Sequence, residues 1–226
     1  MFVGHLAVAL AAKKVEPRVP LWGLVAASFG IDLLWPVLLL AGIEVVQVEP
    51  GNTAFTPLAF ESYPWSHSLG MSLLWGAIAG TAAFLALRHV RSGWIVAAVV
   101  VSHWALDFIT HRPDLPLWPG GLHVGLGLWN SILGTMIVEG GMFAAAIALY
   151  LWCTRPIDQV GRWAFWGLVA LTGLIWGSQP WSPPAPSSKA VAVVSLSMWI
   201  LPFWAAWIER HRSRKGNECT QGDGAA

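Results

Sequence analysis

Residues 93–111 read GWIVAAVVVSHWALDFITH, an apolar run that carries polar side chains in its second half. His103, Asp107 and His111 are spaced four and four. Residues four apart lie on the same face of a helix. The segment therefore predicts a membrane-buried helix with one stripe of metal-ligating or proton-handling groups.

The composition of the whole chain indicates an integral membrane protein. Its 226 residues are 56% hydrophobic and 11% charged, and 16 of them are tryptophan. Soluble domains usually carry about 25% charged residues. The net charge of +1 gives no indication of a nucleic-acid partner. The expected partner is the lipid bilayer.

Hydrophobic segments long enough to cross a bilayer predict an all-α, polytopic bundle of six transmembrane helices. Tryptophans at or near the ends of these segments fit the aromatic belt of a membrane protein. The expected spans are residues 21–43, 67–87, 94–111, 130–152, 161–180 and 188–208.

Lysine and arginine are concentrated in alternate flanks of these spans. The positive-inside rule then places both termini in the cytoplasm. We expect one membrane-embedded domain over 1–209, in which 1–153 forms the metal-site bundle and 160–208 supplies scaffold helices. The basic, Gly-rich tail 210–226 is expected to be disordered.

The first apolar segment, residues 2–12, is only about 16 Å long as a helix, or half a bilayer. Lipid cannot satisfy the exposed backbone amides of such a half-helix, so protein must surround it. The alternative is an amphipathic helix on the membrane surface. The half-helix is favoured because the segment has no polar face.

Two small-residue patterns predict close helix packing. They are Gly76-x-x-x-Gly80 and Gly141-x-x-Ala144.

Ionisable residues lie deep in the first four spans only. Asp32 lies within the first span, His67 opens the second, and Glu139 lies in the fourth. A charge at the bilayer centre costs at least about 2.5–3.5 kcal/mol, so these groups must contact one another, water or a metal. A single histidine can also be a hydrogen-bonded packing residue, and a His–Asp pair can satisfy itself.

Neutral imidazole and carboxylate are the ligands of hydrolytic zinc, manganese or iron sites. Such ions activate water and stabilise a phosphoryl oxygen. A proton relay would instead string its groups across the membrane. The clustering of these residues in the middle and outer half favours a divalent metal, with zinc first.

Several short motifs over residues 1 to about 120 together resemble the bacterial inner-membrane-associated metal-dependent hydrolases, the YdjM-like group. The motifs are Gly4-His5, Ile31-Asp32, His67-Ser68, Ser102-His103 with Asp107, and Leu117-Trp118-Pro119. That group is in turn distantly similar to zinc-dependent phospholipases C and single-strand nucleases.

The resemblance implies a set of metal ligands: His5, Asp32, His67, His103 and Asp107. His111 and Ser68 are candidates for additional ligands. The soluble relatives add a later HxxxE pair, whereas Thr135 stands four residues before Glu139 here. This departure favours one or two metals.

The sequence therefore predicts a metal-dependent hydrolase in the bacterial inner membrane, acting on a phosphoester of a lipid or lipid-linked substrate. Glu139 is the candidate catalytic base, or a further ligand. Two other classes stay open. One is a transporter or channel for a proton or metal ion, and the other is a structural scaffold whose polar cluster fixes helix register.

Overall fold

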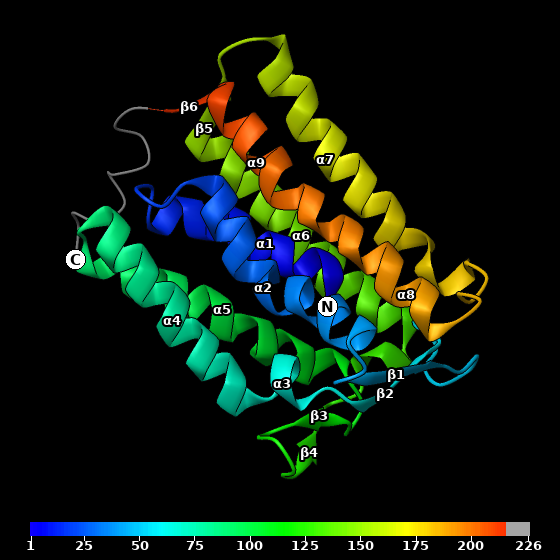
Figure 1. Cartoon of the computed structure of the whole chain (residues 1–226). Helices are drawn as coiled ribbons and strands as arrows, with labels where there is room; N and C mark the ends of the chain where they lie inside the picture. Colours follow the sequence, from blue (N-terminus) through cyan, green and yellow to red (C-terminus); the bar gives the residue numbers. More distant parts are fainter. Residues whose placement is uncertain (216–226) are drawn as a thin grey trace.

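Long apolar helices make up most of the structure, a computed structural model that describes residues 1–215 (Figure 1). The α-helices are α1 (Phe2–Val15), α2 (Leu21–Leu40), α3 (Pro64–His67), α4 (Leu69–Leu87), α5 (Val90–Thr110), α6 (Ile132–Cys153), α7 (Gln159–Ser178), α8 (Ser188–Ser195) and α9 (Ile200–Arg210). Short 3₁₀ turns are η1 (Leu128–Asn130), η2 (Gln179–Trp181) and η3 (Leu196–Trp199).

Three short antiparallel ribbons join the helix ends, which the all-α expectation did not include. They pair β1 (Val45–Val48) with β2 (Leu58–Ser62), β3 (Leu115–Pro116) with β4 (His123–Val124), and β5 (Thr154–Pro156) with β6 (Arg212–Arg214). The ribbons satisfy backbone groups of the connections. The membrane-helix character of the chain is unchanged.

Within residues 1–215, five helices are long and apolar enough to cross a membrane: α2, α4, α5, α6 and the run Ser188–Arg210 that contains α8, η3 and α9. The expected span at 161–180 corresponds to α7, a 20-residue helix that is not among the five. Large apolar side chains on the outer faces of the helices are exposed, Leu73 and Phe203 for example. Such surfaces suit lipid rather than water.

Helix α1 lies inside the bundle, and Figure 1 shows the N-terminus in its middle. Its side chains are buried along most of its length, and α2, α5 and α6 pack against it. A helix on the membrane surface would leave one face open, so that alternative is wrong. The half-helix is surrounded by protein, as its length and composition require.

Basic side chains from distant flanks meet at one end of the bundle. Arg91 at the start of α5 donates to the carbonyl of Val15 at the end of α1, at 3.0 Å. The Lys13 ammonium lies 2.5 Å from the Glu209 carboxylate near the end of α9. The β5–β6 ribbon joins the ends of α6 and α9 at the same place. The basic residues that the sequence places in alternate flanks thus lie together at one end of the bundle.

The prediction that 210–226 is disordered is wrong for Arg210–Lys215, while 216–226 lie outside the described residues. Residues Arg212–Arg214 form β6. The Arg212 side chain, 7% exposed, donates hydrogen bonds to Thr154 and to the carbonyl of Gly161. Basic composition indicated solvation, but this guanidinium is anchored inside the protein.

Helices α4 and α5 pack closely at Gly76 and Gly80, as the spacing of these glycines predicted. A Cβ on Gly80 would lie 2.6 Å from the carbonyl oxygen of Gly93, so only glycine permits this approach. The second small-residue pattern was wrong. A Cβ on Gly141 would meet nothing within 4 Å, so this glycine packs against no neighbour.

Replacing Gly80 with leucine should therefore separate α4 from α5 and destabilise the protein by about 1–3 kcal/mol, the usual cost of overpacking. The measurement is the thermal unfolding midpoint in detergent. Gly141→Leu, in an equally apolar helix, is the matched control and should leave the midpoint unchanged. Equal losses in the two variants would contradict the packing assignment.

Candidate metal centre

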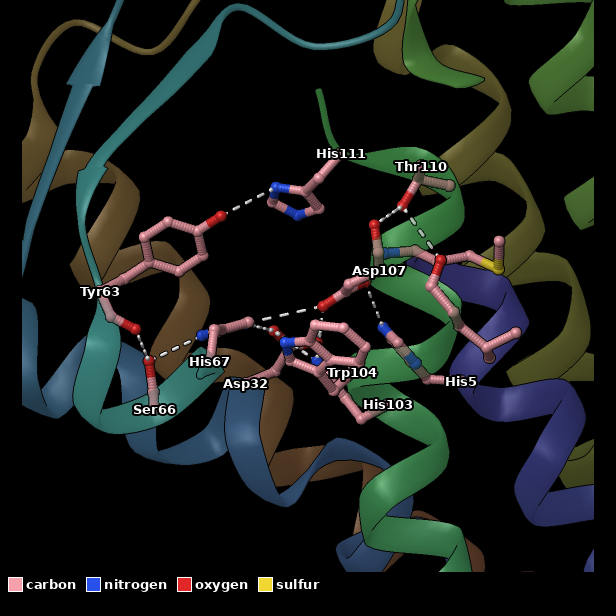
Figure 2. A network of polar contacts seen from close by, with 12 residues as sticks. His5, Asp32, Tyr63, Ser66, His67, His103, Trp104, Asp107, Thr110 and His111 are labelled. Atoms are coloured by element: carbon pink, nitrogen blue, oxygen red, sulfur yellow. Dashed lines mark hydrogen bonds and ion pairs between the residues drawn. The ribbon is translucent and has the colours of Figure 1, made fainter. Parts of the chain in front are cut away.

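The five ligands expected from the sequence converge at one place inside the bundle. His5 comes from α1, Asp32 from α2, His67 from α3, and His103 and Asp107 from α5. Figure 2 shows these side chains pointing toward one another around Asp107. Two overlapping groups could each hold a metal ion: His5, His103 and Asp107, and Asp32, His67 and His103.

The ligand atoms are spaced as they would be around an ion. His103 Nε2 lies 3.1 Å from Asp107 Oδ2, and His5 Nε2 lies 3.2 Å from Asp107 Oδ1. His67 Nε2 lies 3.4 Å from Asp32 Oδ1. Tetrahedral ligands with bonds of about 2.0–2.1 Å stand about 3.4 Å apart. A zinc-sized ion therefore fits these separations.

Buried nitrogen atoms in the cluster lack hydrogen-bond partners. His5 Nδ1, His5 Nε2 and His103 Nε2 make no hydrogen bond within the described part of the chain. The nearest carboxylate oxygens, both of Asp107, lie 3.2 Å from His5 Nε2 and 3.1 Å from His103 Nε2, within ion-pair distance. Leaving such atoms unsatisfied costs about 1–3 kcal/mol each. An ion bound by one nitrogen of each ring would remove that cost for the two ligating atoms.

The backbone fixes His103 in the tautomer that can bind a metal. Its Nδ1 lies 2.8 Å from the carbonyl oxygen of Ser28, which can only accept. Nδ1 must therefore carry the proton, and Nε2 presents its lone pair to the cluster. Ser28 also donates from its hydroxyl to the carbonyl of His5. One residue of α2 thus positions ligands from α5 and α1.

A chain of hydrogen bonds from Glu44 through Ser66, the Glu44 relay, fixes the orientation of His67. Neither Glu44 nor Ser66 was a candidate from the sequence. Ser66 Oγ lies 2.7 Å from Glu44 Oε2 and 2.6 Å from His67 Nδ1. An ionised carboxylate only accepts, so the Ser66 hydroxyl donates to Glu44 and accepts a hydrogen bond from the Nδ1–H group of His67. His67 Nε2 is then free to bind an ion. Such partners are typical of histidines that ligate metals.

Glu44 directly follows the first expected span, 21–43, and is one of three carboxylates before the second. In the structure it is buried and also accepts from the backbone N–H groups of Trp65 and Ser66, each at 2.8 Å. Only the fold of the β1–β2 hairpin against α3 brings it there. The adjacent Ser66-His67 pair was the one local signal.

Asp107 has a further partner in the described chain. The α-amino group of Met1 lies 2.5 Å from Asp107 Oδ1. This ammonium offsets the charge of the carboxylate, and it is the structural alternative to a metal at that oxygen. It leaves the nitrogens of His5 and the Nε2 of His103 without partners. The ion pair alone therefore does not explain the cluster.

His111 and Ser68, the candidates for additional ligands, serve other contacts. His111 lies outside both groups, and its Nδ1 is 3.0 Å from Asp114 Oδ1 and 3.2 Å from the hydroxyl of Tyr63 (Figure 2). Burial and the Asp114 carboxylate raise the pKa of Tyr63. Ser68 caps α4 by accepting from the backbone N–H of Met71.

Glu139 is fully buried on α6, against α1. Its Oε1 lies 3.4 Å from the indole nitrogen of Trp129, and Oε2 has no hydrogen-bond partner in the described residues. The carboxyl interacts with the backbone of Gly4, with the Met1 amino group and with Asp107. It therefore borders the cluster, and it also faces the N-terminal turn of α1, where a carboxylate is favourable.

The number of ions is limited by His103, which belongs to both groups. Its one available nitrogen binds one ion at a time. The two oxygens of Asp107 face different histidines, Oδ1 toward His5 and Oδ2 toward His103. The geometry therefore offers one site around His103, and a second only if a carboxylate bridges two ions.

Removing a ligand should abolish the stabilisation that a metal gives to the folded state. A site at one hundred times its dissociation constant stabilises by about 2.7 kcal/mol. Chelator should therefore lower the unfolding midpoint of the wild type, and should have no effect on His103→Ala or Asp107→Ala. His211→Ala, at the basic end, should respond like the wild type. A chelator response retained in both cluster variants would make the cluster structural.

The Glu44 relay gives a separate prediction. Glu44→Gln can place an amide donor against Ser66, so the hydroxyl must donate to His67 and move its proton to Nε2. We expect metal affinity to fall about 10–100-fold, with metal-free stability nearly unchanged. Ser66→Ala removes the partner of His67 Nδ1, so His67 can adopt either tautomer. We expect a smaller loss of metal affinity than in Glu44→Gln.

Glu61→Gln, an exposed carboxylate of the same hairpin, is the control for this series. Metal titrations followed by isothermal calorimetry provide the measurement. If Glu44→Gln and Glu61→Gln bind metal equally well, the relay does not position His67.

Comparison with known proteins adds no assignment. No family model, curated protein or solved structure matches this chain. The candidate metal centre therefore rests on its own geometry.

Proposed function

We propose that this protein is a membrane-embedded metal-dependent hydrolase of the YdjM-like type, acting on a phosphoester of a lipid or lipid-linked substrate. The observation that carries the proposal is the convergence of three imidazoles and two carboxylates from four helices, with buried ring nitrogens left unpartnered. A scaffold needs only hydrogen-bonded polar groups, and unsatisfied ones would weaken it.

Zinc is the proposed metal, with manganese or iron as alternatives, because the ligands are nitrogen and oxygen at near-tetrahedral spacing. His103, His67 and Asp32 or His103, His5 and Asp107 would hold it. A bound divalent cation would make water a stronger nucleophile and polarise a phosphoryl oxygen. The protein fixes His103 and His67 in the tautomers that can bind the metal, and it buries both rings away from water.

Glu139 is the proposed general base. Its Oε2 is buried and unpartnered next to the cluster, so it can accept a proton from an attacking water. Positioned bases contribute about a hundred- to ten-thousand-fold in rate. None of the five ligands has to leave the metal for this task.

A lipid or lipid-linked substrate suits the surroundings of the cluster. Asp32 is the most exposed of the five ligands, at 19%. Beyond the Glu44 relay, a cavity of about 730 Å³ is lined by the end of α2, β1 and the start of α8. Its lining combines apolar Leu39 and Leu40 with Gln47 and Lys189. Such a mixture matches a molecule with a polar head and an apolar tail.

The proposed location is the bacterial inner membrane with both termini in the cytoplasm. The basic side chains gather at one end of the bundle, and that end belongs on the cytoplasmic side by the positive-inside rule. The His–Asp cluster would then lie in the outer half of the protein.

Glu139→Gln tests the function, because it keeps the side-chain volume and removes the charge. If Glu139 is the base, hydrolysis of a chromogenic phosphodiester by the purified, metal-loaded protein should fall at least a hundredfold while bound metal stays at the wild-type level. Glu49→Gln, exposed in the outer hairpin, is the control and should keep full activity.

Other outcomes assign different roles. Loss of both metal and hydrolysis would make Glu139 a ligand. Unchanged metal and hydrolysis would leave it as a partner of the N-terminal turn of α1. Wild-type protein that binds metal, hydrolyses no phosphodiester and moves the ion across vesicles would overturn the hydrolase in favour of a transporter.

A further inference from the structure

A second cavity lies at the opposite end of the bundle from the His–Asp cluster. Its volume is about 210 Å³, room for about seven waters at ~30 Å³ each. The end of α1, the end of α6 and the β5–β6 ribbon surround it. The residues that carry the argument are Lys13, Lys14, Arg212, Arg214 and Glu209.

Positive charge dominates the lining of this cavity. Among the described residues that line it, Glu209 is the single carboxylate, and it is already paired with Lys13 at 2.5 Å. Three cations remain: Lys14, Arg212 and Arg214. Within the described chain none of the three forms an ion pair with a carboxylate. The Lys14 ammonium lies 4.5 Å from the centroid of the Trp152 ring.

Arg212 is the strongest indication of a missing anion. Its guanidinium is 7% exposed, donates to Thr154 and to the carbonyl of Gly161, and lies 5.0 Å from the centre of the Phe165 ring. These neutral partners satisfy its N–H groups but not its charge. A buried charge without a counter-charge is costly, and proteins normally pair it.

We propose that this cavity binds a phosphate-bearing anion, either the headgroup of an anionic lipid or a soluble phosphate. Arginine and lysine together are the usual phosphate ligands. Basic pockets between transmembrane helices bind lipid headgroups of this kind. The site is separate from the metal centre and does not depend on the proposed hydrolase activity.

Binding also has a structural consequence. The cavity is lined by residues of α1, of α6 and of the chain after α9, so an anion would link three segments far apart in sequence. A ligand that binds only the folded protein raises its stability. The unfolding midpoint therefore reports binding without knowledge of any activity.

The test uses the full chain in a non-ionic detergent. Phosphatidylglycerol or phosphatidylcholine is titrated into the micelles, and inorganic phosphate or chloride is titrated separately at constant ionic strength. A rise in midpoint with phosphatidylglycerol alone assigns a lipid headgroup, and a rise with inorganic phosphate assigns a soluble anion.

The variants remove positive charge from the cavity but keep Arg212, whose hydrogen bonds anchor the β5–β6 ribbon. Each basic side chain near an anionic lipid contributes roughly fivefold, so the double variant Lys14→Gln/Arg214→Gln should raise the half-saturating concentration about twenty-five-fold. Lys14→Gln alone should raise it about fivefold. Arg162→Gln is the control, because Arg162 is exposed at the start of α7 and does not line the cavity.

Two results would overturn the site. One is no response of the wild type to either phosphatidylglycerol or inorganic phosphate. The other is an equal loss in Arg162→Gln and in Lys14→Gln/Arg214→Gln, which would show that general surface charge, not this cavity, attracts the anion.

Discussion

The carboxylate of Asp107 is the constraint on which the inner part of this protein depends. It is 2% exposed on an apolar helix, where a lone charge costs at least about 2.5–3.5 kcal/mol. Four groups lie within 3.9 Å of its oxygens: the Met1 ammonium, which pairs with the charge, and the imidazoles of His5, His67 and His103. Three of these come from outside α5. Contacts with one carboxylate therefore hold α1, α3 and α5 in a single arrangement.

The half-helix α1 is the element that this arrangement orders. A helix of 14 residues is too short to cross a bilayer, so it is stable only where neighbouring helices cover its backbone ends. Burial of α1 places His5 beside His103, and the two rings stack with centroids 3.6 Å apart. Packing against α6 also brings Glu139 to its first turn. The packing of α1 thus also determines which side chains meet in the candidate metal centre.

Spacing and hydropathy predicted the parts that depend on local periodicity. The interval from His103 to Asp107 is one helical turn, and both side chains reach the cluster. The glycines of α4 that pack on α5 also follow from spacing. Glu44 could not be found in this way, because its burial depends on how a hairpin folds against α3. The burial of Arg212 could not be predicted either. A basic segment at the end of a chain is expected to lie in solvent, and only the tertiary contacts of Arg212 show that it does not.

Asp107 and Arg212 are both buried single charges, and the difference in their surroundings is informative. Cationic or protonatable groups surround Asp107, so that site can be neutral in sum before any ligand arrives. Among the described residues, the Arg212 guanidinium contacts the hydroxyl of Thr154, the carbonyl of Gly161 and the ring of Phe165, all neutral, and Lys14 and Arg214 line the same cavity. Burial accordingly lowers the pKa of Arg212. The protein thus separates its buried anionic and cationic groups along its length, and the two proposed ligands, a metal cation and a phosphate-bearing anion, have opposite signs.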